Sequence, residues 1–95
     1  MNKSQIMQTI VDYLKKYQVK EVGFFGSFMR DEMNPESDID VLVSYKRGTT
    51  LFDIVKMHLD LKEKIGRKVD LVSRDAVRPD IMKYIQKDLH TMYHA

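Results

Sequence analysis

The chain has 95 residues, 43% hydrophobic and 32% charged, with a net charge of +2 and no cysteine. This length predicts one domain over residues 1–95, and the missing cysteines exclude disulfides and thiolate metal sites. Lys and Arg are scattered, which argues against a dedicated nucleic-acid binder. No apolar run suits a signal peptide or a membrane span, so we expect a cytoplasmic protein.

Helical and strand patterns alternate along the chain. The predicted order is helix 4–17, strand 19–25, helix 27–33, strand 38–45, helix 51–65, strand 68–72 and helix 79–92. The helices are predicted from apolar residues at three- and four-residue spacing, and the strands from runs rich in Val and Phe. Ser4 is the expected first N-cap, Gly66 suits a helix C-terminus, and Pro79 suits a first helical turn.

This α-β-α-β-α-β-α order predicts an α/β fold, classed as α+β in some schemes. We expect helices packed on a three-stranded sheet. The short connection between the first two strands permits an antiparallel pair, whereas the helical crossover to the third strand favours a parallel one. The sequence therefore predicts a mixed sheet.

Two acids at alternate positions lie in the second predicted strand. Side chains two residues apart on a strand share a face, so Asp38 and Asp40 should project together. Asp is disfavoured in strands, and a third acid, Asp70, lies within the next predicted strand. If these strands are neighbours, the three carboxylates converge.

Converging carboxylates need neutralisation. Each like-charge pair at about 4 Å costs roughly 4 kcal/mol at an effective dielectric constant near 20. Protons or cations must therefore compensate, and an all-oxygen ligand set suits Mg²⁺ or Mn²⁺. Two such ions can hold the attacking and leaving oxygens of a phosphoryl displacement. The alternative is that the acids are solvent-facing strand residues of an open sheet.

A small-residue turn, Gly26-Ser27, follows the first predicted strand and opens the short helix. Backbone N–H groups at a helix start bind phosphate, glycine allows close approach, and the Ser27 hydroxyl can donate a further hydrogen bond. Arg30, one turn on, either reaches the phosphates or pairs with a carboxylate. The alternative for the turn is an ordinary capped strand-to-helix connection.

The pattern Gly26-Ser27-x10-Asp38-x-Asp40, with Asp70 on a later strand, resembles the DNA polymerase β-like nucleotidyltransferase superfamily. Within it, the chain resembles the minimal nucleotidyltransferases, small prokaryotic proteins often encoded beside a HEPN-domain toxin as its antitoxin. The resemblance implies that Asp38 and Asp40 hold two metal ions and the nucleotide triphosphate. It also implies that Asp70 ligates the metal that activates the acceptor hydroxyl, with a second role as its base left open, and that Gly26 and Ser27 hold the β- and γ-phosphates.

For this subgroup the resemblance implies transfer of AMP from ATP to a toxin tyrosine. In so short a chain we expect no second domain to grip an acceptor. We therefore expect the acceptor on a partner protein or in a cleft shared by two copies. Two alternatives stay open. The first is a non-catalytic module that neutralises a partner by masking it, and the second is a nucleotidyltransferase acting on a small molecule such as an aminoglycoside.

We expect structural roles, and not catalytic ones, for the histidines and the last helix. We expect His58 to be a satisfied core or interface residue, and not a metal ligand. His90 and His94 have helical i,i+4 spacing but no implied acidic partner. The apolar stripe of Met82, Ile85, Leu89 and Met92 is expected to pack on the sheet, with a partner-binding helix as the alternative.

Overall fold

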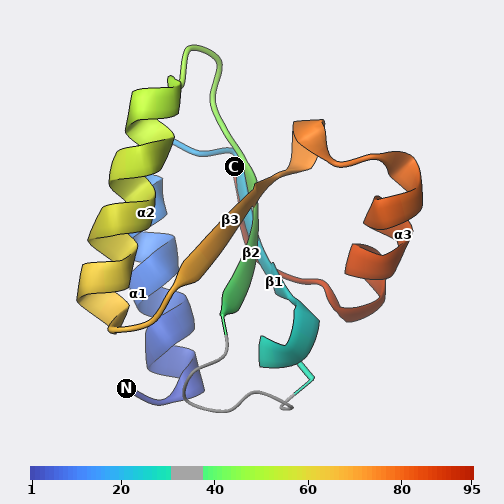
Figure 1. Cartoon of the computed structure of the whole chain (residues 1–95), viewed down its shortest axis with the longest axis horizontal. Coiled ribbons are helices and arrows are strands. Elements are labelled where there is room, and N and C mark those ends of the chain that lie inside the picture. The colour runs from blue at the N-terminus through green and yellow to red at the C-terminus, as the bar shows by residue number, and fades with distance from the viewer. Residues whose placement is uncertain (31–37) are drawn as a thin grey trace.

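Helices and strands alternate through the part of the chain that the computed structural model describes, residues 1–30 and 38–95 (Figure 1). The elements are α1 (Lys3–Lys15), β1 (Glu21–Phe25), the 3₁₀ helix η1 (Gly26–Phe28), β2 (Ile39–Ser44), α2 (Leu51–Ile65), β3 (Val69–Ser73), the 3₁₀ helix η2 (Arg74–Ala76), α3 (Pro79–Asp88) and β4 (His90–His94). None of the helices in these ranges is long and apolar enough to cross a membrane.

The sheet has the strand order β3-β2-β1-β4. β1 runs antiparallel to β2 and to β4, and β2 runs parallel to β3. The predicted α/β class and mixed sheet are therefore confirmed.

The expected strand count of three is wrong, because 90–94 form β4 and do not continue the last helix. Without β4, β1 would expose an unpaired edge, and pairing along that edge outweighs the helical spacing of the apolar residues.

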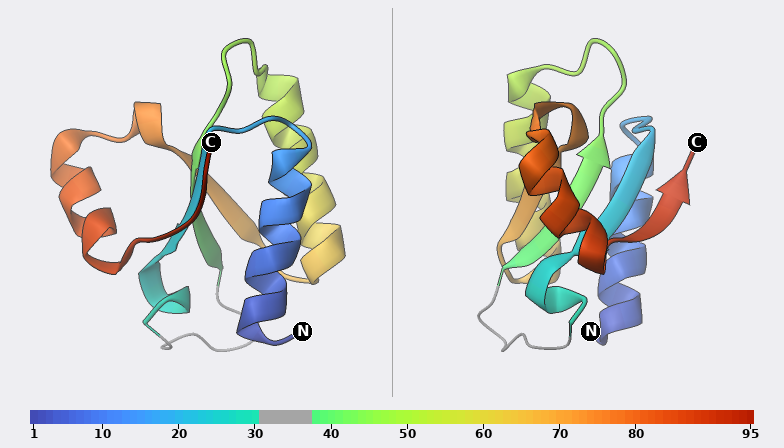
Figure 2. Two further views of the ribbon diagram at one scale, coloured as in Figure 1. Left: turned by 180° about the vertical axis from the view of Figure 1, so that it is seen from behind. Right: turned by 90° about the vertical axis from the view of Figure 1, so that its right-hand side faces the viewer.

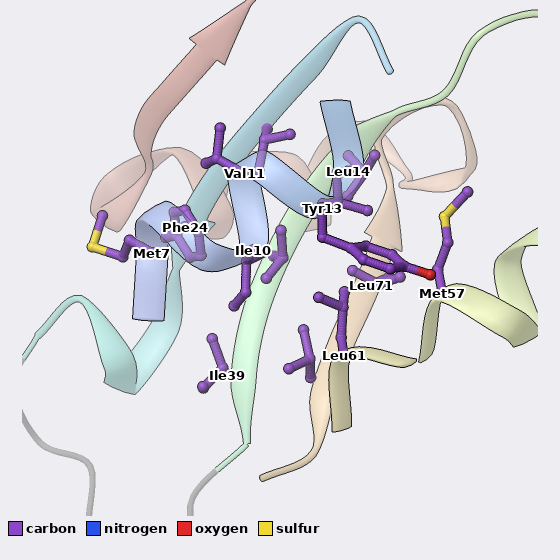
Figure 3. Packing of buried hydrophobic residues seen from close by; sticks show 14 of the residues in the cluster. Met7, Ile10, Val11, Tyr13, Leu14, Phe24, Ile39, Met57, Leu61 and Leu71 are labelled. Carbon is purple, nitrogen blue, oxygen red and sulfur yellow. The ribbon is translucent and has the colours of Figure 1, made fainter. Parts of the chain in front are cut away.

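Helices cover both faces of the sheet. α1 and α2 lie side by side against one face, and α3 stands on the other (Figure 2). The main core fills the first of these layers, where Ile10, Leu14 and Leu61 are fully buried against the strands (Figure 3). Alternate strand residues supply the sheet's part of this core. They are Val22, Phe24, Ile39, Val41, Val43, Val69 and Leu71.

The intervening strand residues face α3. Leu42 is fully buried although it does not belong to the main core cluster, and Ile85 of α3 is also buried outside that cluster. Because side chains alternate along a strand, Asp40 lies on the same face as Leu42. The candidate acids therefore belong to the α3 side of the sheet.

The helix ends follow local sequence rules. Asn2 caps α1 in a capping box with Gln5, so the predicted cap at Ser4 is wrong by two residues. The Asn2 side chain accepts a hydrogen bond from the Gln5 backbone N–H, a donor in the first turn that has no partner within the helix. The predictions that α2 ends at Gly66, in the left-handed conformation (φ 78°), and that Pro79 opens α3 are both confirmed.

Only part of the apolar surface of α2 is buried. Met57 and Leu61 are buried, with Ile54, His58 and Ile65 half-buried beside them. α2 carries more apolar residues than one face can bury. The remainder are exposed, and they are Leu51, Phe52, Val55 and Leu59.

Candidate functional site

Asp40 and Asp70 lie directly beside each other on the parallel strands β2 and β3, where their Cα atoms are register partners. Their neighbours Val41, Val69 and Leu71 point into the main core, so the two acids share the opposite face. Both acids are half-buried. The predicted convergence is therefore present for this pair.

Asp38 lies just before β2, two residues from Asp40, and its side chain is more exposed. Its Oδ2 is 3.7 Å from Nζ of Lys68, at the start of the neighbouring strand. An ion pair this exposed holds its side chains only weakly. Asp38 is thus at the rim of the acidic pair, where a competing ligand can displace the lysine.

Gly26 packs against Asp40. A Cβ at position 26 would come within 2.3 Å of Oδ2 of Asp40, and the residue has a φ of +75°, which disfavours any other amino acid. The register explains the approach, since Phe25, at the end of β1, pairs with Asp40. The Gly26-Ser27 turn and the acidic pair therefore lie against each other.

The helix that starts at this turn is shorter than predicted. Among the described residues it is a single 3₁₀ turn, Gly26–Phe28, and the remainder of the predicted helix, 31–33, lies outside the described residues. So short a turn has little helix dipole. A phosphate placed here would have to be held by the Ser27 hydroxyl and local backbone N–H groups.

Arg30 forms an ion pair with Asp88, the last residue of α3. Of the two expectations for Arg30, pairing with a carboxylate is the one present in the structure. The same guanidinium partly opposes the rise in the pKa of Asp40 that burial and the neighbouring acids cause. The sequence does not indicate Asp88, because the predicted helix runs on to Met92 and so places no helix end near the site.

The electrostatics of Asp40 are unfavourable to its charged form. Burial raises the pKa of this carboxyl above its usual value, and the negative charges of Asp70 and Asp38 raise it further, against the opposing effect of Arg30. A bound cation would remove both the desolvation cost and the repulsion.

The donor set suits a hard divalent cation that takes part of its coordination from a ligand. Within residues 1–30 and 38–95, no three His, Cys, Asp or Glu side chains are grouped closely enough to hold a metal ion by themselves. Mg²⁺ commonly binds through one or two carboxylates, with water and substrate phosphates completing its octahedron. The Asp40–Asp70 pair beside a glycine turn fits that mode of binding.

The histidines follow the plainer interpretation. Nδ1 of His58 lies 3.1 Å from the carbonyl oxygen of Val69, which satisfies this half-buried side chain. His90 and His94 belong to β4, so their spacing is not helical. Elsewhere on the sheet, Arg74 forms a bidentate ion pair with Glu21 of β1, with N–O distances of 2.6 and 3.1 Å.

Comparison with known proteins decides the family. Residues 7–91 match the nucleotidyltransferase domain family. The chain belongs to this family. A protein from Methanocaldococcus jannaschii, provisionally named a protein adenylyltransferase, is 37% identical over 79 residues, which cover 83% of this chain and 85% of the relative.

Solved structures agree with this nucleotidyltransferase fold. One, described provisionally as a minimal nucleotidyltransferase, is 26% identical, with a TM-score of 0.82 and 95% coverage of both chains. A chain from a complex of tri-AMPylated Shewanella oneidensis HEPN toxin with MNT antitoxin is 14% identical, with a TM-score of 0.78, covering 99% of this chain and 74% of that one. At that identity the likeness shows the fold alone. The predicted membership among minimal nucleotidyltransferases is confirmed, and the protein is an enzyme of this class.

Proposed function

We propose that this nucleotidyltransferase moves AMP from ATP to a hydroxyl group on a partner protein, and that the partner is a HEPN-type toxin. The observation that carries the proposal is the contact of Gly26 with Asp40, which itself lies beside Asp70. A phosphate-binding turn and a pair of carboxylates are the two parts that transfer of a nucleotidyl group requires.

The reaction balances simply. The acceptor oxygen attacks the α-phosphorus of ATP, a new P–O bond forms, the bond to the β-phosphate bridging oxygen breaks, and pyrophosphate leaves. The hydroxyl proton passes to a base, for which Asp70 is the candidate. Ser27 and the backbone N–H groups of its turn would hold the β- and γ-phosphates, and Arg30 would contribute positive charge beside them.

The proposed metal ligands are Asp38, Asp40 and Asp70, with two Mg²⁺ or Mn²⁺ ions as the cofactors. When bound, the ions would neutralise the triphosphate and lower the pKa of the acceptor hydroxyl. The protein's own part is to align the carboxylates: β2 and β3 fix Asp40 and Asp70 side by side, and Gly26 leaves room for the Asp40 carboxylate against the turn.

Three observations support a protein as the acceptor. A relative is named a protein adenylyltransferase, and a structural neighbour comes from a complex that contains an AMPylated HEPN toxin. The enzyme also exposes large apolar side chains on α2, including Phe52 at 88% and Leu51 at 74%. Clustered exposed apolar side chains are typical of surfaces that contact another protein.

The test is label transfer from α-³²P-ATP with Mg²⁺ and the product of the adjacent gene. We expect label on a tyrosine of that product with the wild type and none with Asp38→Ala, whereas Asp80→Asn, a carboxylate change at the far end of α3, should leave transfer intact. Undiminished transfer by Asp38→Ala would overturn the proposal. Toxin neutralisation by an Asp38→Ala/Asp40→Ala double variant would instead favour a masking module.

A further inference from the structure

The C-terminal end of α3 is fastened to the strand that leads into the site. Leu89 follows directly after the helix, and its Cδ1 lies 2.7 Å from where a Cβ of residue 23 would be. Only the glycine at position 23 leaves this space to Leu89. Because Gly23 lies on the α3 side of β1, three residues before Gly26, the helix end is held close to the Gly26-Ser27 turn, which we call the phosphate turn.

The residue at that helix end is unusual. An acid in the last turn faces the negative end of the helix dipole, which disfavours it. Asp88 nevertheless ends α3, with its side chain only 22% exposed, and it receives a hydrogen bond from Nη1 of Arg30. The guanidinium compensates for the poor position, so the pairing has a role that the helix alone does not explain.

Arg30 connects this helix end to the Gly26-Ser27 turn. Its backbone N–H donates to the carbonyl of Gly26 at 3.2 Å, so its main chain closes the phosphate turn. A guanidinium is a rigid plane, so the hydrogen bond to Asp88 constrains the direction in which that plane lies.

We propose that Asp88 is a positioning residue, which holds the guanidinium of Arg30 toward the β- and γ-phosphates of the bound nucleotide. This inference rests on the proposed function, and it adds a group on α3 to a site otherwise built from the sheet and the turn. A merely structural ion pair would stabilise α3 and leave nucleotide affinity unchanged when its charges are exchanged.

The experiment measures binding of AMP-PNP with Mg²⁺ by calorimetry, and melting temperature, on the wild type and on Asp88 variants. Asp88→Asn should weaken binding roughly tenfold, because a charge-assisted hydrogen bond no longer orients Arg30. Asp88→Glu should recover most of the affinity. Asp80→Asn, on the same helix and paired with Arg78 at 2.8 Å, should bind like the wild type.

The charge exchange, Arg30→Asp with Asp88→Arg, distinguishes a positioning role of Asp88 from a purely structural role of the ion pair. The exchange should restore the melting temperature relative to Asp88→Asn, but not the affinity, because no guanidinium then extends from the phosphate turn. Unchanged affinity in Asp88→Asn, or full affinity in the exchanged variant, overturns the inference about Asp88 alone. No binding by the wild type, or equal binding by Asp40→Asn, overturns the proposed function as well.

Discussion

Gly26 and Asp40 occupy adjoining space so closely that a methyl group on the glycine would overlap the carboxylate, at 2.3 Å from Oδ2. The turn after β1 and the acid on β2 therefore lie in direct contact. Antiparallel pairing of the two strands creates this contact, since Phe25 and Asp40 are register partners. A change on either side should displace the other.

Gly26→Ala should abolish AMP transfer and lower stability. The φ of +75° costs an alanine about 1–2 kcal/mol, and the overlap with Asp40 adds strain and moves the carboxylate. Gly66→Ala is the matched control, since Gly66 has a φ of +78° and no atom of the described residues lies within 4 Å of the place its methyl group would take. It should lose similar backbone stability and keep activity, as measured by thermal melts and label transfer. Equal activity losses in both variants would contradict the coupling.

Mg²⁺ with AMP-PNP should stabilise the enzyme through Asp40. Ligand at a hundredfold excess over its Kd adds about 2.7 kcal/mol to the free energy of unfolding. Asp40→Asn should show a smaller shift in melting temperature, because it removes a proposed ligand of the ion. A shift as large as that of the wild type would mean that the cation binds elsewhere.

Without metal, the contribution of Asp40 to folding stability should change with pH in the opposite direction to that of most carboxylates. Its raised pKa means that the folded state holds the proton more tightly than the unfolded chain, so its contribution to stability falls as pH rises above the ordinary Asp value. In EDTA at pH 7, Asp40→Asn should melt at a higher temperature than the wild type. This advantage should shrink as the pH is lowered toward 4.

Tyr13 and Asp60 join α1 to α2, and this contact should be lost in acid. The Tyr13 hydroxyl donates to Asp60, whose pKa is lowered first by its hydrogen bond with Lys56 and then by Tyr13. Stability from a lowered carboxyl pKa is present above the ordinary Asp value and is lost as pH falls. Tyr13→Phe should therefore lower the melting temperature at pH 7 and have less effect near pH 3, whereas exposed Tyr84→Phe should have little effect at either pH.

Truncation of a side chain to alanine should affect stability differently on the two faces of α2. Leu61 is fully buried, so Leu61→Ala should lower the free energy of unfolding by about 2–5 kcal/mol. Leu59 is 64% exposed, and Leu59→Ala should change it by less than about 0.5 kcal/mol. Urea denaturation measures both, and a large loss in Leu59→Ala would contradict the packing described for α2.

The Asp pair is predictable from the sequence because a charge in an apolar strand conflicts with local preference. The approach of Asp70 to Asp40 is predictable as well, since a helical crossover favours two parallel neighbouring strands. The predicted bounds of α2 agree with the structure, where Thr50 caps the helix and Gly66 ends it.

The C-terminal strand and the role of Asp88 could not be predicted in the same way. The apolar residues from Met82 to Met92 keep helical spacing, and only the open edge of β1 selects a strand for 90–94. The pairing of Asp88 with Arg30 joins residues 58 positions apart, and it depends on that same helix end. Tertiary pairing, which no local pattern encodes, decided both.

The most direct test of the account is a crystal structure with AMP-PNP and Mn²⁺, with the ions located by anomalous scattering. We predict Mn²⁺ bound by Asp38, Asp40 and Asp70 together with phosphate oxygens, and the β- and γ-phosphates against Gly26 and Ser27. Manganese or triphosphate bound away from the Asp40–Asp70 pair would contradict it.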